Sequence, residues 1–220
     1  MRRALSQISI VASMESSILL LKTKAYNIIL NLRDLQIIHI LTVCSPIGNK
    51  CALRYAKMIR PMQIEDAPRV ADIHTRAWQV AYKGILDQKL LDEIDVQERE
   101  MMWRDRIIPN AERVNLVFEN EGRIKGWAAF GTSSDDGQTQ ELIGIYVDPF
   151  HFREGVGTEL WKATSALMLE ENPKHLALWV LEDNKQAISF YKKIGFSVTQ
   201  EIRRIAWLGD AVEVQYTKQA

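Results

Sequence analysis

The sequence predicts an α/β fold, because apolar runs typical of strands alternate with segments of helical periodicity. Residues 142–147 form a run rich in Leu, Ile and Val, which predicts a buried strand. A helical segment follows this strand after two glycines, and residues 176–182 and 184–196 repeat the order of strand and helix. Apolar side chains also recur at steps of three and four residues over 67–81, which predicts an amphipathic helix.

The other elements follow from local signals in chain order. Residues 58–62 predict an edge strand, since Pro61 has no N–H to donate to a ladder. Asp66 and Pro68 are typical of a helix start, and residues 96–107 predict a charged helix with a solvated face. The remaining predictions are strands at 114–118 and 124–130 joined by a turn at 119–122, a mobile loop at 132–138, and a closing hairpin of 202–207 and 212–216.

A break in composition near Met58 divides the chain. Residues 1–57 carry eight basic and two acidic side chains and both cysteines, Cys44 and Cys51. The rest carries 20 basic and 26 acidic side chains, all six tryptophans and ten of the eleven glycines. We therefore expect residues 1–57 to be a poorly ordered extension or the result of a misassigned start, and residues 58–220 to be one domain. The alternative is that residues 28–43 form a helix that packs on the domain or on a partner.

Composition also excludes several classes of function. The chain has 28 basic and 28 acidic residues, so its overall charge gives no reason to expect nucleic-acid binding. The two cysteines lack a C-x-x-C spacing or a nearby histidine, which predicts neither a metal site nor a disulfide framework and favours the cytoplasm. No apolar run reaches the roughly 18 residues of a transmembrane helix, and the N-terminus does not resemble a signal peptide.

The segment from residue 148 to residue 160 predicts an anion-binding site. Asp148 and Pro149 end the predicted strand, and Gly155 and Gly157 precede a helix. The first turn of a helix presents unpaired N–H groups and partial positive charge, and glycines let a phosphate approach the backbone. The dinucleotide pattern G-x-G-x-x-G fails because Leu160 stands at its third glycine, and the P-loop pattern fails because its lysine is missing. On this segment alone, an ordinary tight turn is the alternative.

Two motifs resemble those of the GCN5-related N-acetyltransferase (GNAT) superfamily. Residues 147–149 (V-D-P) and 152–157 (F-R-E-G-V-G) are similar to its V-x-P and [QR]-x-x-G-x-[GA] patterns, except that Phe152 replaces Gln or Arg. Residues 184–196 (N-K-Q-A-I-S-F-Y-K-K-I-G-F) resemble its second motif, N-x-x-A-x-x-F-Y-x-K-x-G-F. The resemblance covers about residues 58–216, and it implies a mixed central sheet of about seven strands with helices on both faces.

A third segment, residues 77–85 (A-W-Q-V-A-Y-K-G-I), is similar to the A-W-x-x-A-Y-x-G-I/L signature of one GNAT subgroup. In that subgroup, mostly small-molecule N-acetyltransferases, the segment forms the first helix and the loop over the acceptor pocket. The resemblance implies substrate-binding roles for Trp78 and Tyr82, and the alternative is that both rings only pack. His74, on the same helix, is expected to be a core residue rather than a catalyst.

The resemblance implies acetyl-CoA as co-substrate, bound by the central strand, the glycine loop and the start of the last helix. The implied contacts are made by Ile145, Tyr146, Val147, Arg153, Glu154, Gly155, Val156, Gly157, Thr158 and Asn184. Because Glu154 would bring negative charge to a pyrophosphate, we expect its side chain to point outward. Asn184 is also expected to cap its helix.

The resemblance further implies two catalytic side chains. Tyr191, in the F-Y pair, stands where many members have the acid that protonates the departing thiolate. Glu141 lies six residues before Val147, where histone-acetylating members have a catalytic glutamate. The alternatives are that Glu182 is the base, or that Glu141 only ends its strand in solvent.

Together these patterns predict direct transfer of an acetyl group from acetyl-CoA to a primary amine of a small molecule. No metal, nucleic acid or membrane is expected to take part, and a homodimer is compatible with the sequence. The alternatives are a protein or peptide acceptor and a non-catalytic acyl-CoA-binding module. The sequence does not specify the acceptor, the acyl-chain preference or the oligomeric state.

Overall fold

A computed structural model describes residues 57–107, 113–133 and 137–220, and four short strands nearer the N-terminus. The chain divides into two compact units, Met1–Arg60 with Phe118–Ile124, and Pro61–Val117 with Lys125–Ala220. The four strands pair antiparallel in sequence order, and they are β1 (Ser9–Ala12), β2 (Ile18–Lys22), β3 (Asn27–Asn31) and β4 (Gln36–Ile38).

The alternative of a helix over residues 28–43 is wrong for those of its residues that the structure describes. Ile29 pairs with Ile38 and Leu30 with Ile37 across the ladder of β3 and β4. Isoleucine is among the residues that favour strands, and residues 28–43 hold five of them. Whether residues 1–57 are dispensable stays a prediction.

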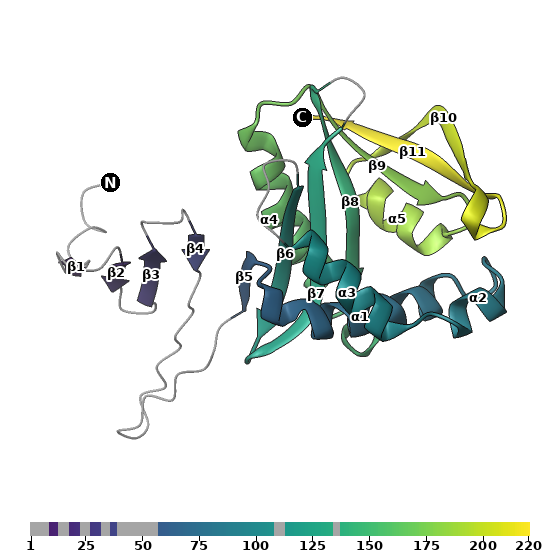
Figure 1. Cartoon of the computed structure of the whole chain (residues 1–220). Coiled ribbons are helices and arrows are strands. Elements are labelled where there is room, and N and C mark those ends of the chain that lie inside the picture. Colours follow the sequence, from purple (N-terminus) through teal and green to yellow (C-terminus); the bar gives the residue numbers. More distant parts are fainter. Residues whose placement is uncertain are drawn as a thin grey trace. The chain divides into compact units, whose positions relative to one another are not determined.

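The larger sheet has the strand order β10-β11-β9-β8-β7-β6-β5, which places β8 in its middle (Figure 1). It is mixed, because β8 and β9 are parallel while β7 and β8, β9 and β11, and β10 and β11 are antiparallel. The predicted seven-stranded mixed sheet is confirmed. Its strands are β5 (Met58–Pro61), β6 (Arg113–Asn120), β7 (Arg123–Thr132), β8 (Thr139–Val147), β9 (His175–Leu181), β10 (Ser197–Ile205) and β11 (Ala211–Gln219).

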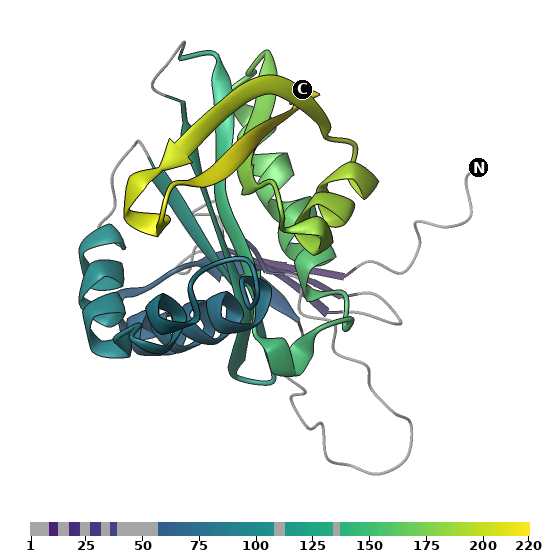
Figure 2. The same cartoon turned by 90° about the vertical axis from the view of Figure 1, so that its right-hand side faces the viewer.

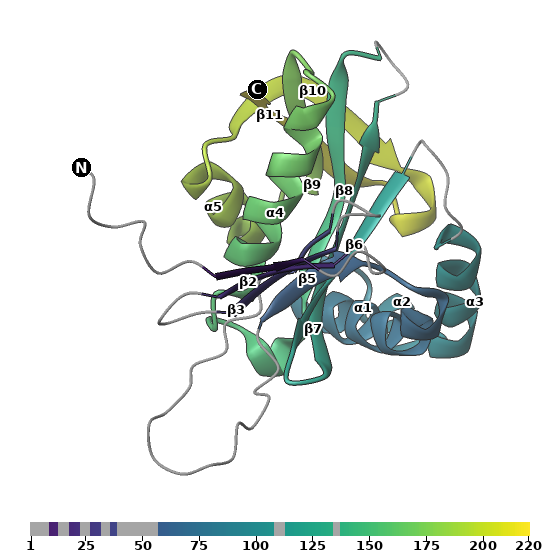
Figure 3. The same ribbon diagram turned by 90° about the vertical axis from the view of Figure 1, so that its left-hand side faces the viewer.

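Helices cover both faces of this sheet, as predicted (Figures 2 and 3). On one face lie α1 (Ala67–Ala81), α2 (Gln88–Asp92) and α3 (Val96–Arg106), and on the other lie α4 (Val156–Glu170) and α5 (Lys185–Lys193). The stripe of α1 that the sequence predicts is buried, including Val70, Ala71 and Ala77. Three short 3-10 turns, η1 (Ile64–Asp66), η2 (Pro149–His151) and η3 (Ala206–Leu208), join these elements.

The middle of the sheet opens between β8 and β9. Their parallel pairing runs from Thr139 and His175 to Leu142 and Leu178, although β8 continues to Val147. On its other side β8 stays paired with β7 as far as Val147, with a register shift at Ile143 that makes this residue a bulge. The second half of β8 therefore has one edge that is not paired with β9.

Local predictions agree with the observed elements in most places. The edge strand, the amphipathic helix, both hairpins and the two strand–helix units are present where expected. Helix α2 was not predicted, since five residues are too few to establish a helical period. The predicted mobile loop lies partly outside the described residues, at 134–136. Within the described part of the chain, no helix is long and apolar enough to cross a membrane.

Candidate active site

A large cleft of about 890 Å³ lies where β8 and β9 separate. Its floor is the free half of β8, and its walls are the starts of α4 and α5 together with the end of α1. The cleft contains nearly all of the residues that the sequence predicts to bind the co-substrate. Those lining it are Ile145, Tyr146, Val147, Arg153, Gly155, Val156, Gly157, Thr158 and Asn184.

The start of α4 forms one end of this cleft and presents backbone N–H groups there. Gly155 precedes the helix with φ +83°, a left-handed conformation that glycine adopts without strain. Arg153 is also left-handed, with φ +65°, and it lines the cleft beside Phe152. The N–H groups of the first helical turn have no partners within the helix, so they are available to an anion.

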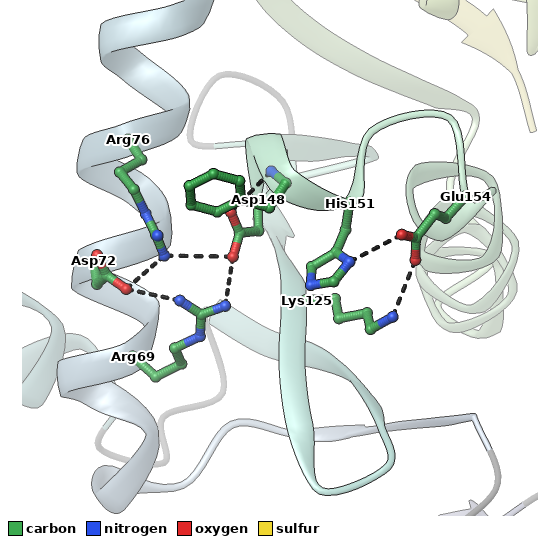
Figure 4. Close-up of polar contacts among 8 residues, drawn as sticks. Arg69, Asp72, Arg76, Lys125, Asp148, His151 and Glu154 are labelled. Atoms are coloured by element: carbon green, nitrogen blue, oxygen red, sulfur yellow. Dashed lines mark hydrogen bonds and ion pairs between the residues drawn. The ribbon is translucent and has the colours of Figure 1, made fainter.

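Glu154 belongs to this loop but does not line the cleft. Its carboxylate accepts from Lys125 Nζ at 3.0 Å and lies 3.0 Å from His151 Nδ1 (Figure 4). The pKa of Glu154 is below its usual value, chiefly because of the hydrogen bond with His151 and next because of the one with Lys125. The side chain is thus turned away and its charge is compensated, as the sequence prediction required. The role of the Glu154 backbone stays a prediction.

Asp148 fixes the turn between β8 and the glycine loop (Figure 4). It is almost fully buried, and its Oδ2 accepts from the guanidinium groups of Arg69 and Arg76 on α1. Its Oδ1 accepts from the backbone N–H of Phe150 at 3.2 Å. The half-buried Asp72 bridges the same two arginines. Asp148 therefore ties the end of the central strand to α1, and it positions the loop that follows.

Tyr191 and Asn184 enter the cleft from α5. Asn184 caps this helix, accepting from the Ala187 N–H at 3.1 Å, which confirms the predicted cap. The Tyr191 ring packs between those of Phe190 and Phe196, with ring centroids 5.6 and 6.3 Å away. Burial raises the pKa of Tyr191 well above its ordinary value. The hydroxyl is consequently protonated at neutral pH and able to act as an acid.

A small pocket of about 310 Å³ adjoins the large cleft. The two cavities share Tyr82, Ile143, Tyr146, Arg203 and Glu213 in their linings. The rest of its lining is aromatic, basic or aliphatic. It comprises His74, Trp78, Trp127, Trp207, Arg106, Arg113, Leu181, Ile205 and Leu208. Both rings predicted to bind substrate, Trp78 and Tyr82, are therefore at this pocket.

Hydrogen bonds order the aromatic wall at the junction of the two cavities. Tyr82 Oη lies 2.9 Å from Tyr146 Oη, and the indole N–H of Trp78 donates to Tyr146 Oη at 3.2 Å. Burial is the main reason why the pKa values of Tyr82 and Tyr146 are raised. Both hydroxyls therefore stay neutral at pH 7 and offer hydrogen bonds rather than charge.

His74 packs among four rings, those of Trp78, Trp103, Trp127 and Tyr146. The indole N–H of Trp103 donates to its Nδ1 at 3.3 Å. Burial, followed by the charge of Arg99, lowers its pKa well below the ordinary value. A neutral His74 with Nδ1 as acceptor fits the predicted core role, although one side of the ring also reaches the small pocket.

Three acidic residues occupy different positions relative to the cavities. Glu141 lines the large cleft within the paired half of β8, between Gly131 and Ala177. Glu213 lines both cavities and accepts from Arg203 Nε at 2.7 Å. Glu182, the alternative base, is exposed and lines neither cavity.

Sequence reasoning did not find Glu213, Arg203, Arg106 and Arg113. They lie in segments without a motif, on β10 and β11 (Arg203, Glu213), at the end of α3 (Arg106) and on β6 (Arg113), and only the tertiary fold brings all four to one pocket. Among the residues that the structure describes, no group of three His, Cys, Asp or Glu side chains could hold a metal ion.

Comparison with known proteins gives consistent matches. A sequence model described as the acetyltransferase (GNAT) family matches residues 69–196. An uncharacterized N-acetyltransferase of Bacillus subtilis is 27% identical over 136 residues, which are 61% of this chain and 76% of that protein. A spermidine N(1)-acetyltransferase of Thermoplasma acidophilum is 21% identical over 141 residues, which are 64% of this chain and 88% of that protein.

The fold also matches solved structures. The PaiA N-acetyltransferase of Thermoplasma acidophilum, solved in complex with coenzyme A, superimposes with a TM-score of 0.63. The match covers 75% of this chain and 99% of that one at 19% identity. At this identity the likeness concerns the fold alone.

Proposed function

We propose that this chain, which belongs to the acetyltransferase (GNAT) family, transfers an acetyl group from acetyl-CoA to a primary amine of a small molecule. Membership of the family makes it an N-acetyltransferase, and the size of the acceptor is our own inference. One observation carries that inference. The small pocket joins the large cleft through shared residues, and its volume of about 310 Å³ is at the lower end for ligand sites.

The large cleft offers backbone groups for two parts of acetyl-CoA, the pyrophosphate and the pantetheine arm. The first turn of α4, with Gly155, Val156 and Gly157, offers backbone N–H groups to the pyrophosphate. A Cβ atom at Gly157 would lie 3.6 Å from Val147, an ordinary contact distance, so packing does not require glycine here. Without a side chain, Gly157 leaves the space beside the helix start open to a phosphate. The free edge of β8, from Ile145 to Val147, offers N–H and C=O groups to the pantetheine arm.

Tyr191 is proposed as the general acid. When the amine nitrogen attacks the thioester carbonyl carbon, the C–S bond breaks and the leaving sulfur needs a proton. Tyr191 lines the large cleft, and its phenolic hydroxyl carries its proton at neutral pH. An N–H group on the free edge of β8 is proposed to stabilise the oxyanion.

Glu141 is proposed as the base that takes the amine proton through water. It lines the large cleft from the central strand, whereas Glu182 lies outside both cavities. The variant Glu141→Gln should lower turnover most at low pH, where fewer amines are already neutral. If its pH–rate profile equals that of the unaltered protein, Glu141 is not the base.

The acceptor proposal is tested by mixing the protein with acetyl-CoA and a panel of small amines, and by measuring the release of thiol. We expect release that depends on at least one amine and continues over many turnovers. If acetyl-CoA raises the melting temperature but no amine or peptide gives thiol release, the protein is a binding module. If only peptides carrying free amines give release, the acceptor is a protein.

The cytoplasmic location and the number of subunits stay predictions.

A further inference from the structure

Beyond the residues that it shares with the large cleft, the small pocket is lined mainly by rings and aliphatic side chains. This part of its lining comprises His74, Trp78, Trp127, Trp207, Leu181, Ile205, Leu208, Arg106 and Arg113. In the proposed function the amine meets the thioester where the cavities join, so this part of the pocket contacts the remainder of the acceptor. An apolar body suits it best, since a polar body would lose contacts with water that the rings do not replace.

The charged side chains of this pocket offer no site for a second amino group. Glu213 is the one acid in the described lining, and it is paired with Arg203 at 2.7 Å. Arg106 is exposed to solvent in the last turn of α3, and Arg113 Nε donates to Asn115 Oδ1 at 2.9 Å. A diamine or polyamine would therefore place its second ammonium group in the pocket without a carboxylate to pair with. This arrangement favours a monoamine.

Two of the indole rings in the lining lie close together and nearly parallel. The ring planes of Trp78 and Trp207 differ by 11°, and their centroids are 6.2 Å apart. Their surroundings differ, because the Arg99 guanidinium stacks on Trp78 at 4.4 Å whereas Trp207 is 68% exposed on η3. Apolar ring surface in contact with water is unfavourable, and a second ring that packs on it removes water from both. The exposed surface of Trp207 is therefore available to a ring of the acceptor.

We propose that the acceptor is an arylalkylamine, a monoamine whose carbon chain carries one aromatic ring. Its nitrogen lies where the cavities join, beside the hydroxyls of Tyr82 and Tyr146, which can accept from an N–H group. Its ring lies in the small pocket and packs against Trp78 and Trp207. Aromatic walls prefer an aromatic ring to an aliphatic ring of similar size, because offset and edge-to-face contacts add to the burial of apolar area. This inference rests on the proposed function and names the class of its acceptor.

The test compares amines of one series, with thiol release from acetyl-CoA as the readout. The series consists of ethylamine, phenethylamine, tryptamine, 2-cyclohexylethylamine, putrescine and spermidine. We expect kcat/KM for the better arylalkylamine to exceed that for ethylamine by about tenfold or more, since burial of a ring contributes this much. Phenethylamine should exceed 2-cyclohexylethylamine by roughly two- to tenfold. Both polyamines should be poorer substrates than the arylalkylamines.

The variant Trp207→Ala tests where the ring of the acceptor packs. Because Trp207 is exposed, its replacement should disturb the fold little, and the affinity for acetyl-CoA checks this. The variant should lower the ratio of kcat/KM for the better arylalkylamine to that for ethylamine by about threefold or more, chiefly through KM. Ile202→Ala is the matched control, because Ile202 is exposed on the same hairpin and lines neither cavity. It should leave the ratio unchanged.

Three results would overturn this inference. The first is use of ethylamine or a polyamine that is at least as efficient as use of both arylalkylamines. The second is equal use of phenethylamine and 2-cyclohexylethylamine, and the third is a preference that Trp207→Ala leaves intact. None of them affects the proposed function, because amine-dependent thiol release would still have been observed. The absence of release with every amine would instead contradict the proposed function itself.

Discussion

At the scale of single residues, the proposed chemistry depends most on the hydroxyl of Tyr191. The ring is buried between Phe190 and Phe196, so its position does not rely on the hydroxyl. Tyr191→Phe therefore removes the proton donor and leaves the packing. We expect kcat to fall by about 10²–10⁴, the usual contribution of general acid catalysis, with little change in acetyl-CoA affinity. A kcat within about twofold of the unaltered protein would exclude Tyr191 as the acid.

The pKa of Tyr191 adds a prediction about pH. An ordinary tyrosine loses its proton near pH 10, whereas burial keeps this one protonated beyond that value. Ionisation of Tyr191 should therefore not reduce kcat below pH 10. A kcat profile measured with the best amine checks this. An alkaline decline centred well below pH 10 that disappears in Tyr191→Phe would contradict it.

Single residues were predictable where a motif fixes them and not elsewhere. Asn184 and Tyr191 belong to one short helix, so their sequence spacing already determines their relation. Glu213 and Arg113 are about a hundred residues apart, and strand pairing alone brings them to one pocket. The outward direction of the Glu154 side chain was expected from its charge. Its partner Lys125 could not be predicted, because Lys125 lies on β7, about thirty residues earlier in the chain.

At the scale of elements, the loop between β8 and α4 must place an acidic residue beside a phosphate site. Lys125 compensates the charge of Glu154, so Lys125→Met should weaken coenzyme A binding by roughly two- to fivefold, and Glu154→Gln should have little effect. The double variant should bind as tightly as the unaltered protein. Isothermal titration at pH 7 checks this cycle, and additive effects of the two changes would contradict it.

The same cycle has a defined dependence on pH. The pKa of Glu154 is lowered in the folded protein, so its carboxylate is charged at neutral pH and remains so into mild acid. The coupling between Lys125 and Glu154 is therefore complete at pH values above the pKa of an ordinary glutamate. It is lost as the pH falls through the lowered pKa of Glu154.

The turn that follows β8 depends on the buried carboxylate of Asp148. Asp148→Asn keeps the shape but removes the charge that two arginines of α1 contact, and should cost about 1.5–3 kcal/mol. The expected fall in Tm is about 3–12 °C, together with weaker coenzyme A binding. Asp72→Asn is the matched control, since Asp72 contacts the same arginines while its side chain is 42% exposed against 2% for Asp148. An equal fall in both variants would show that burial of Asp148 contributes nothing.

Elements were predictable where their signals are local. Prolines and glycines mark the ends of β8 and the start of α4, and a three- and four-residue period marks α1. The bulge at Ile143 and the separation of β8 from β9 have no such signal, because they depend on strands that are distant in sequence. The family resemblance implied only that the central strand binds the co-substrate.

At the scale of the whole molecule, the seven-stranded sheet and both cavities are built from residues that follow Lys57. We therefore propose that residues 58–220 fold alone and bind acetyl-CoA as tightly as the full chain. Comparison of Tm, affinity and turnover for the two proteins tests this. A shorter protein that is insoluble or melts much lower would show that residues 1–57 belong to the fold.

The central claim is that acetyl groups pass from acetyl-CoA in the large cleft to a small amine in the small pocket. The most direct test is a mass balance over many turnovers with the best amine of the panel. We predict that free CoA and the N-acetylated amine appear one for one, while the mass of the protein stays constant. Acetyl-CoA that binds but stays intact in the presence of every amine, or an acetyl group found only on protein, would contradict the claim.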